Sequence, residues 1–172
     1  MNEITLRQAV PFDWPAVSEL LAASKLPRDG AQDHLPSFVV ALREGTVVGV
    51  AGLEIYGDVA LLWSVAVRAE QRRQGIGQSL MQELVRQAQA QRMLNIYLLT
   101  TTAAGYFATH GFKDTARTAV PPPLLASVAF NGVFQSRQPS CTLDSSRVAA
   151  VALPGRSLRM LLARRGSKSR RC

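Results

Sequence analysis

Apolar residues in the first part of the chain follow strand patterns, interrupted by one helix. Alternation predicts a strand at 3–7. Asp13 precedes Trp14-Pro15 and a helically spaced apolar set, so we expect it to be the N-cap of a helix that ends at Leu26-Pro27. Further strands are expected at 38–42, 46–55 and 59–67, the first two forming a hairpin. The strand at 59–67 is almost continuously apolar, which is typical of a strand covered on both faces, so it should lie centrally in its sheet.

After residue 75 the apolar period changes to that of an amphipathic helix, with one stripe formed by Ile76, Leu80, Leu84 and Ala88. A strand is then expected at 93–100, a short helix at 103–110 stopped by Gly111, and a weaker strand at 112–118. Beyond three consecutive prolines, short apolar clusters within residues 124–145 predict a helix or turn and a last edge strand. Strands that alternate with helices in this way indicate a chain of the α/β (α+β) class.

Length and composition narrow the class of protein. A chain of 172 residues with 47% apolar residues is enough for one ordinary globular domain. No apolar run reaches the roughly 20 residues that cross a bilayer, and the polar, acidic N-terminus is not that of a signal peptide. Two cysteines form neither a disulfide framework nor a zinc set, and the two histidines lack metal-ligand spacing. We therefore expect a cytoplasmic protein without a metal or a membrane partner.

The net charge of +8 comes from the C-terminus. Residues 1–145 contain 12 basic and 12 acidic residues, whereas residues 146–172 contain 8 basic residues and no acidic one. We therefore predict a single domain at 1–145 and a basic, flexible tail at 146–172. The folded part has no net charge, and the tail has no interleaved aromatic residues. A nucleic-acid partner is therefore not expected, and only the tail could contact one.

The segment from Val65 to Gly77 is the one that suggests chemistry. A buried strand enters a glycine-containing turn that opens a long helix, and the first turn of a helix has unpaired N–H groups and a positive dipole end. Glycines at 75 and 77 leave room for an anion, and Arg72 and Arg73 add positive charge. The pattern fits a pyrophosphate site, although it is neither a Walker loop nor the dinucleotide fingerprint. A glycine turn that serves only packing is the alternative.

The spacing Arg72-x-x-Gly75-x-Gly77 resembles the signature of the GNAT acetyltransferases, and the order of elements over about 3–118 is similar to that family. The resemblance implies a mixed, mostly antiparallel sheet with a splayed pair of parallel strands, flanked by helices. Within the family the chain looks closest to the arsenic-resistance type of small N-acetyltransferase, on segments that include Gly52-Leu53-Glu54 and 97–103.

That resemblance implies an acetyl-CoA site between the splayed strands 59–67 and 93–100. The main chain of Val65, Ala66 and Val67 would pair with the pantetheine arm, and Thr101 and Ala104 would lie beside it. Backbone amides of the turn and the first helical residues would hold the pyrophosphate, namely those of Arg72, Arg73, Gln74, Gly75, Ile76, Gly77 and Gln78.

The sequence offers two candidate catalytic residues, Tyr106 and Glu54. Many family members carry a proton-donating tyrosine where this chain has Phe107; Tyr106 is next to it but about 100° away on a helix, so it is a substitute only if the helix start is irregular. Glu54, a charged residue in an apolar strand, is our candidate for the base that deprotonates the amine, unless it lies on the solvent face. Ser64 and Arg117 are candidate substrate contacts, with ordinary sheet and solvent roles as the alternatives.

The function expected from these residues is transfer of an acetyl group from acetyl-CoA to the primary amine of a small molecule, with resistance to an amino-acid-like toxic compound as a specific case. Acetylation of a protein N-terminus or lysine is an alternative with the same donor motif. A non-catalytic CoA-sensing or nucleic-acid-binding module is another. Dimers are frequent in the family, so a homodimer stays open.

Overall fold

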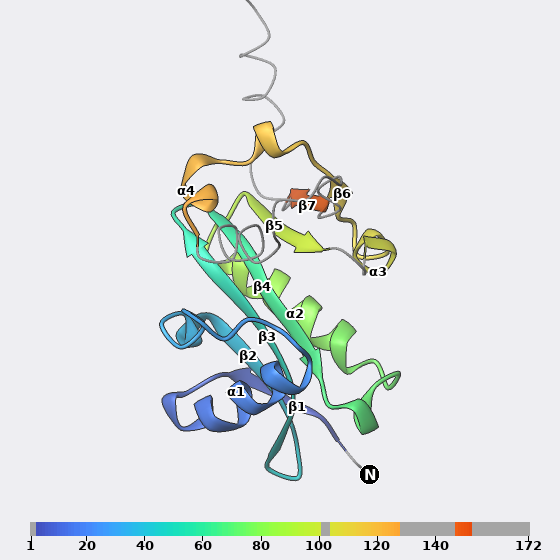
Figure 1. Cartoon of the computed structure of the whole chain (residues 1–172). Coiled ribbons are helices and arrows are strands. Elements are labelled where there is room, and N and C mark those ends of the chain that lie inside the picture. Colours follow the sequence, from blue (N-terminus) through green and yellow to red (C-terminus); the bar gives the residue numbers. More distant parts are fainter. Residues whose placement is uncertain (1–2, 101–103, 128–146, 153–172) are drawn as a thin grey trace, which may run out of the picture.

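A computed structural model describes residues 3–100, 104–127 and 147–152. Its strands form one seven-stranded sheet in the order β1-β2-β3-β4-β5-β7-β6 (Figure 1). The strands are β1 (Thr5–Gln8), β2 (Phe38–Arg43), β3 (Thr46–Tyr56), β4 (Val59–Val67), β5 (Asn95–Thr100), β6 (Lys113–Asp114) and β7 (Arg147–Ala152). The α-helices are α1 (Trp14–Ala23), α2 (Ile76–Ala90), α3 (Ala104–Ala108) and α4 (Pro122–Leu125). Short 3₁₀ helices are η1 (Pro11–Asp13), η2 (Leu35–Ser37), η3 (Ala69–Gln71) and η4 (Arg117–Ala119).

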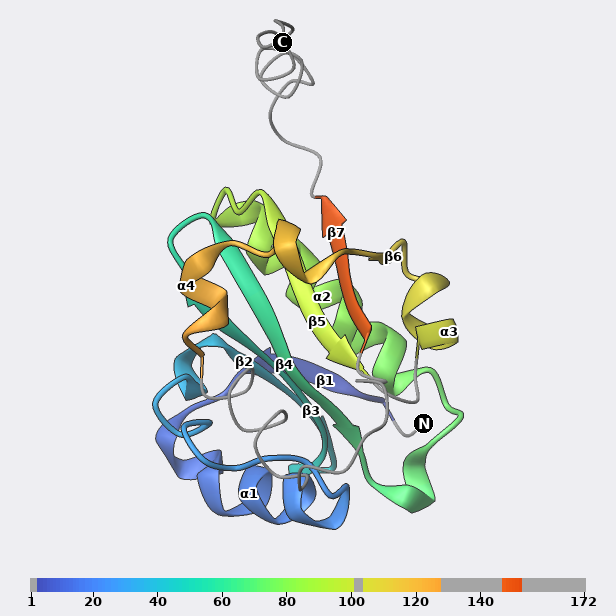
Figure 2. The same ribbon diagram turned by 45° about the horizontal axis from the view of Figure 1, so that its top comes forward.

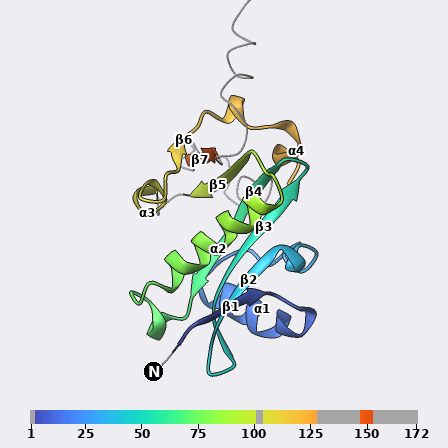
Figure 3. The same ribbon diagram turned by 180° about the vertical axis from the view of Figure 1, so that it is seen from behind.

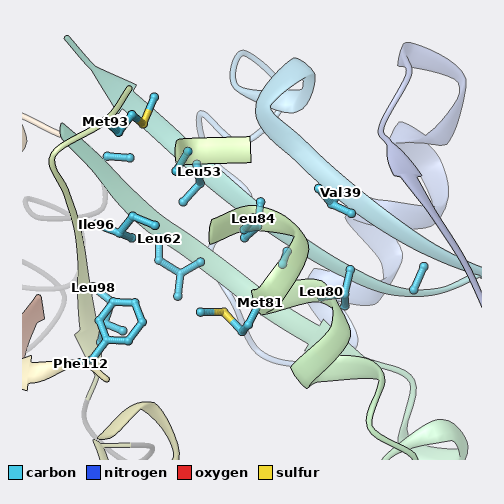
Figure 4. Close-up of a cluster of buried hydrophobic side chains, with 14 of the residues drawn as sticks. Val39, Leu53, Leu62, Leu80, Met81, Leu84, Met93, Ile96, Leu98 and Phe112 are labelled. Carbon is cyan, nitrogen blue, oxygen red and sulfur yellow. The ribbon is translucent and has the colours of Figure 1, made fainter. Parts of the chain in front are cut away.

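The sheet is mixed and mostly antiparallel, as expected, and β4 is its central strand. The helix α2 lies across one face, as the view from behind shows (Figure 3). Its apolar stripe packs on side chains that include Val39, Leu53 and Leu62, in the largest core cluster (Figure 4). The helix α1 packs on the opposite face, around Phe38 and Val50. This two-sided cover explains why β4 is apolar on both faces.

The parallel pair β4–β5 opens partway along its length. Pairing runs from Val59 opposite Asn95 to Leu62 opposite Leu98, where it ends, although both strands continue. At the same level β4 has an extra residue, because Leu62 is opposite Leu53 and Ser64 is opposite Gly52 across β3. Trp63 is therefore the extra residue of a β-bulge, and bulges bend and twist a strand away from its neighbour. The splayed pair of strands expected from the resemblance is confirmed.

Asp13 takes the predicted N-cap position of α1 without a side-chain cap bond, and one predicted strand is shorter than expected. Asp13 precedes α1, but its side chain makes no cap bond there; it accepts hydrogen bonds from both terminal nitrogens of Arg7, at 2.6 and 2.8 Å, and from Val10 N at 2.8 Å. The weak strand expected at 112–118 is reduced to the two residues of β6, followed by η4.

The C-terminal part of the sheet also differs from the prediction. The short helix expected after the prolines is α4, whereas residues 128–146, where an edge strand was expected, lie outside the described residues. The strand that does join the sheet here is β7, which pairs antiparallel with β5 on one side and β6 on the other. The sheet thus reaches Ala152, beyond the domain boundary predicted at residue 145. Within the described part of the chain, no helix has the length and apolar character of a membrane span.

Candidate functional site

A pocket of about 450 Å³ lies where the turn after β4 meets the start of α2 and the helix α3. Figure 2 shows how these elements are arranged. We call it the donor pocket, because most of the residues predicted to hold acetyl-CoA line it. Its lining residues are Val67, Gln71, Arg72, Arg73, Gly75, Ile76, Gly77, Gln78, Tyr106, Thr109 and His110. Gln71, Thr109 and His110 were missed by the sequence reasoning. A search for polar residues in the turn that follows α3 would have found the last two.

The turn that forms the donor pocket has the backbone that an anion site needs. Gly75, which precedes α2, has a φ of 79°, and Arg73 has a φ of 61°, so two residues of the turn are left-handed. Arg72 Nε donates to Val67 O at 3.0 Å, which fixes its guanidinium at the end of β4. The first N–H groups of α2 have no intrahelical acceptor and lie at the positive end of a 15-residue helix. The turn can therefore bind phosphate groups through its backbone and its arginines.

Tyr106, and not Phe107, faces the donor pocket. A Cβ added at Gly77 would lie 3.2 Å from the Tyr106 hydroxyl, so this tyrosine reaches the first turn of α2. Phe107 instead packs edge-to-face on Phe112, with ring centroids 5.8 Å apart, against the core under α2. Burial raises the pKa of Tyr106, so its hydroxyl stays protonated at neutral pH and can donate a hydrogen bond.

The open edge of β4 offers main-chain groups toward the gap between β4 and β5. Arg68 N donates to Val48 O at 2.9 Å, and polar groups alternate between the two edges of an antiparallel strand. By this alternation Ala66 directs its N–H and C=O toward β3, whereas Val65 and Val67 direct theirs toward the gap. Of the three residues expected to pair with pantetheine, two thus have the required orientation.

Three other residues that were predicted to contact acetyl-CoA are not among those that line the donor pocket in the described part of the chain. Gln74 is not among the residues that line the donor pocket, and its side-chain nitrogen lies 3.4 Å from Glu70 O. Ala104 begins α3, close to the pocket. Thr101 lies outside the described residues.

Glu54 lies on the opposite face of the sheet from α2 and is buried, with 3% of its surface exposed. Its neighbours Leu53 and Ile55 belong to the cluster under α2, so the side chain between them points the other way. Its Oε1 accepts a hydrogen bond from the Tyr56 hydroxyl at 2.5 Å and lies 3.1 Å from His34 Nε2. Its Oε2 is buried and has no hydrogen-bond partner among the residues that the structure describes. The solvent-face alternative is therefore wrong.

The pKa of Tyr56, which donates a hydrogen bond to Glu54, is shifted by its surroundings. Burial, followed by the hydrogen bond to Glu54, raises the pKa of Tyr56, so the tyrosine remains a donor to the carboxylate. Ser64 lies on the neighbouring strand opposite Gly52, two residues before Glu54 on β3. It is 4% exposed, and its hydroxyl likewise has no hydrogen-bond partner in the described segments. Buried polar atoms that lack a partner in the described part of the chain, one on Glu54 and one on Ser64 of the neighbouring strand, are a feature expected where a polar ligand binds.

The structure separates the two catalytic candidates of the sequence analysis. Glu54 is opposite Leu61 on β4, and Tyr106 lies at the level of Val67 and Gly77. Six residues along a strand span about 20 Å. Arg117, a candidate substrate contact, begins η4, and nothing is described of its side chain. No group of three or more potential metal ligands is found among the described residues.

Comparison with known proteins agrees with this architecture. Residues 5–112 match the Acetyltransferase (GNAT) family. An amino-acid acetyltransferase from Pseudomonas fluorescens is 29% identical over 96 residues, which cover 55% of this chain and 22% of that protein. The curated relatives are thus much longer, and the chain spans about a quarter of their length.

Solved structures show the same fold at low identity. N-acetylglutamate synthase from Neisseria gonorrhoeae, complexed with coenzyme A and N-acetyl-glutamate, has a TM-score of 0.72 and 19% identity, over 89% of this chain and 36% of the other. Rv2747 from Mycobacterium tuberculosis, in a complex that contains CoA, has a TM-score of 0.73 and 21% identity, over 87% of this chain and 99% of the other. With its motif, its open strand pair and a family match over more than half its length, the chain belongs to the GNAT acetyltransferase family.

Proposed function

We propose that this protein is an N-acetyltransferase that uses acetyl-CoA to acetylate the primary amine of a small, amino-acid-like molecule. The observation that carries the proposal is the opening between β4 and β5. The donor pocket lies at its α2 side, and a buried carboxylate with one free oxygen lies on the opposite face of the sheet. A thioester threaded through the opening would meet an amine bound at Glu54.

The donor pocket fits the phosphate end of acetyl-CoA. The backbone of the turn, Arg72 and Arg73 would bind the pyrophosphate, and a side chain at Gly77 would occupy the space beside Tyr106. From there an extended pantetheine arm would run along the free edge of β4, with Val65 and Val67 as its main-chain partners.

The reaction needs a neutral amine. Glu54 Oε2 accepts the proton of the bound ammonium group, and the amine nitrogen then attacks the acetyl carbonyl carbon. The carbon–nitrogen bond forms, the carbon–sulfur bond breaks, and CoA leaves as a thiolate. The N–H of Val65 would stabilise the oxyanion. A thiol has a pKa of about 8.5, so the thiolate can leave without a strong acid. The nitrogen gives up its second proton as the amide forms, and the thiolate takes up one proton to become CoA thiol. Glu54 releases the first proton to solvent, which restores the carboxylate.

Tyr106 has a different role in this proposal from the one expected. Its hydroxyl reaches the first turn of α2, where the phosphates would bind, and not the region of Glu54. We assign it as a hydrogen-bond donor to the acetyl donor, with its raised pKa keeping it protonated.

Acceptor identity is the finer part of the proposal. The matched relatives named amino-acid acetyltransferases favour an amine of amino-acid type. The sequence resemblance to the arsenic-resistance type adds toxic amino-acid analogues, such as arsenical or phosphinic ones, to the candidates. Arg117 stays a candidate partner for the acceptor's carboxylate, and Ser64 for its polar groups.

A CoA-release assay tests the proposal. Wild-type protein is incubated with acetyl-CoA and, in turn, amino acids, arsenical and phosphinic analogues, polyamines and peptides. We expect release above the amine-free rate with an amino-acid-like acceptor, and mass spectrometry should find one acetyl group on it. Release only with peptides would move the function to protein acetylation. Tight acetyl-CoA binding without turnover on any acceptor would contradict the proposal and favour a CoA sensor.

A further inference from the structure

We propose that His34 is a positioning residue for Glu54, holding one carboxylate oxygen so that the other is presented to the amine. This inference rests on the proposed function, because it assigns Glu54 as the base. His34 lies in the connection between α1 and β2, twenty positions before Glu54, and no motif marks it.

The hydrogen bonds of the carboxylate are distributed unequally. His34 Nε2 and the Tyr56 hydroxyl both reach Oε1, at 3.1 and 2.5 Å, whereas Oε2 has no partner within residues 3–100, 104–127 and 147–152. A carboxylate oxygen only accepts, so the imidazole N–H donates to it. Two donors from different segments fix both the position and the rotation of the carboxylate group. The free oxygen is therefore defined by His34 and Tyr56 together.

The position of His34 is itself tied to the bulge in β4. The ring of Trp63, the bulge residue, lies 6.1 Å from the His34 ring between centroids. Trp63 Nε1 lies 3.5 Å from Pro27 O, and a Cβ on Gly30 would be 3.6 Å from the indole. The residue that opens β4 from β5 thus also packs on the segment that carries His34. This arrangement aligns the base with the opening through which the acetyl group would arrive.

The partial exposure of the His34 side chain means that its role can be tested by substitution. Its side chain is 31% exposed, whereas that of Glu54 is almost fully buried. A substitution at His34 therefore changes the support of Glu54 without opening a cavity in the core.

Three variants test the inference: His34→Leu, which removes the donor; His34→Gln, which keeps an N–H donor; and Gln32→Leu, an exposed control in the same segment. The kcat and KM values for the best amine, the acetyl-CoA affinity and urea denaturation are measured for each. We expect His34→Leu to lower kcat about 10- to 100-fold, the effect of losing one hydrogen bond to a charged group. His34→Gln should recover most of that loss, and Gln32→Leu should behave as wild type. Acetyl-CoA affinity should be unchanged in all three, because His34 does not line the donor pocket.

Failure of this inference is distinguishable from failure of the proposed function. If wild type acetylates amines and a folded His34→Leu protein keeps its kcat, the role of His34 is overturned while the proposed function stands. An equal loss in the Leu and Gln variants would also overturn it, since the donor would then not be the cause. If wild type acetylates no amine at all, the proposed function fails and the role of His34 fails with it.

Discussion

Asp13 and Glu54 are both buried carboxylates, and the number of their partners differs. Asp13 accepts three hydrogen bonds, two from Arg7 and one from the backbone, so its charge is compensated within the protein. Among the described residues, Glu54 has partners on one oxygen alone. A buried polar atom without a partner costs stability, so we interpret Asp13 as structural and Glu54 as functional.

The Asp13–Arg7 pair should make stability depend on acidity. The hydrogen bonds from Arg7, followed by the backbone bond from Val10, lower the pKa of Asp13 in the folded state. A lowered pKa stabilises the fold above the unfolded-state value of about 3.9 and loses that contribution as pH falls through the folded-state pKa. We expect Asp13→Asn to cost about 1–2 kcal/mol of unfolding free energy at pH 7, Arg7 being partly exposed, and less below pH 4.

Urea denaturation at several pH values measures this difference. Asp33→Asn, at an exposed position, is the matched control and should change little. A difference between wild type and Asp13→Asn that stayed constant down to pH 2.5 would contradict the assignment.

Gly77 gives a prediction for the donor pocket. Valine at this position would place its Cβ 3.2 Å from the Tyr106 hydroxyl and two methyl groups farther into the pocket. We expect Gly77→Val to weaken acetyl-CoA binding at least about tenfold, measured by calorimetry. Gly105→Ala, where an added Cβ meets nothing within 4 Å, is the control. Equal affinities in the two variants would place the phosphates elsewhere.

At the scale of elements, the contact between β2 and β3 depends on one glycine. Phe38 is fully buried, and a Cβ added at Gly52, which pairs with it, would overlap its ring. We expect Gly52→Ala to cost about 1–3 kcal/mol of unfolding free energy through overpacking. Phe38→Leu in the same chain should relieve part of that cost, so the two changes should be non-additive in a double-mutant cycle. Additive effects would show that the strain lies elsewhere.

Single elements were predictable where the local pattern decides them. The bounds of β4 follow from its apolar run and the start of α2 from its period and the preceding glycine. The bulge at Trp63 was not predicted, because it is a register shift against β3 and leaves no gap in the apolar run. The strand β7 was assigned to the tail because its partner β5 lies about fifty residues earlier, and local composition does not report such pairing.

At the scale of the whole molecule, β7 extends the sheet beyond residue 145. Its six residues pair with β5, and β6 pairs on its other edge. A chain that stops after Ser146 loses these pairs, and we expect it to lose more than about 3 kcal/mol of unfolding free energy at roughly 0.5–1.5 kcal/mol for each hydrogen bond. A chain that stops after Ala152 should keep wild-type stability and acetyl-CoA affinity. Thermal denaturation of both proteins measures the difference, and similar melting temperatures would contradict the role of β7.

The candidate site was predictable in its motif and less so in its long-range contacts. The turn from Arg72 to Gly77 could be identified because phosphate binding uses contiguous backbone. The burial of Glu54 required knowing which face of β3 each residue occupies. His34 could not be found, because only the fold brings its segment to Glu54. Helical spacing alone could not tell whether Tyr106 faces the donor pocket, because the orientation of this short helix depends on the packing of Phe107.

The central claim is that one opening in the sheet joins a donor pocket to a carboxylate base. The measurement that tests it most directly compares wild type with Glu54→Gln for acetyl-CoA affinity and for the rate of acetylated product formation. We expect unchanged affinity and a fall in kcat of about 10²–10⁴-fold, the usual contribution of a general base. A Glu54→Gln protein that acetylates the amine as fast as wild type would contradict the account.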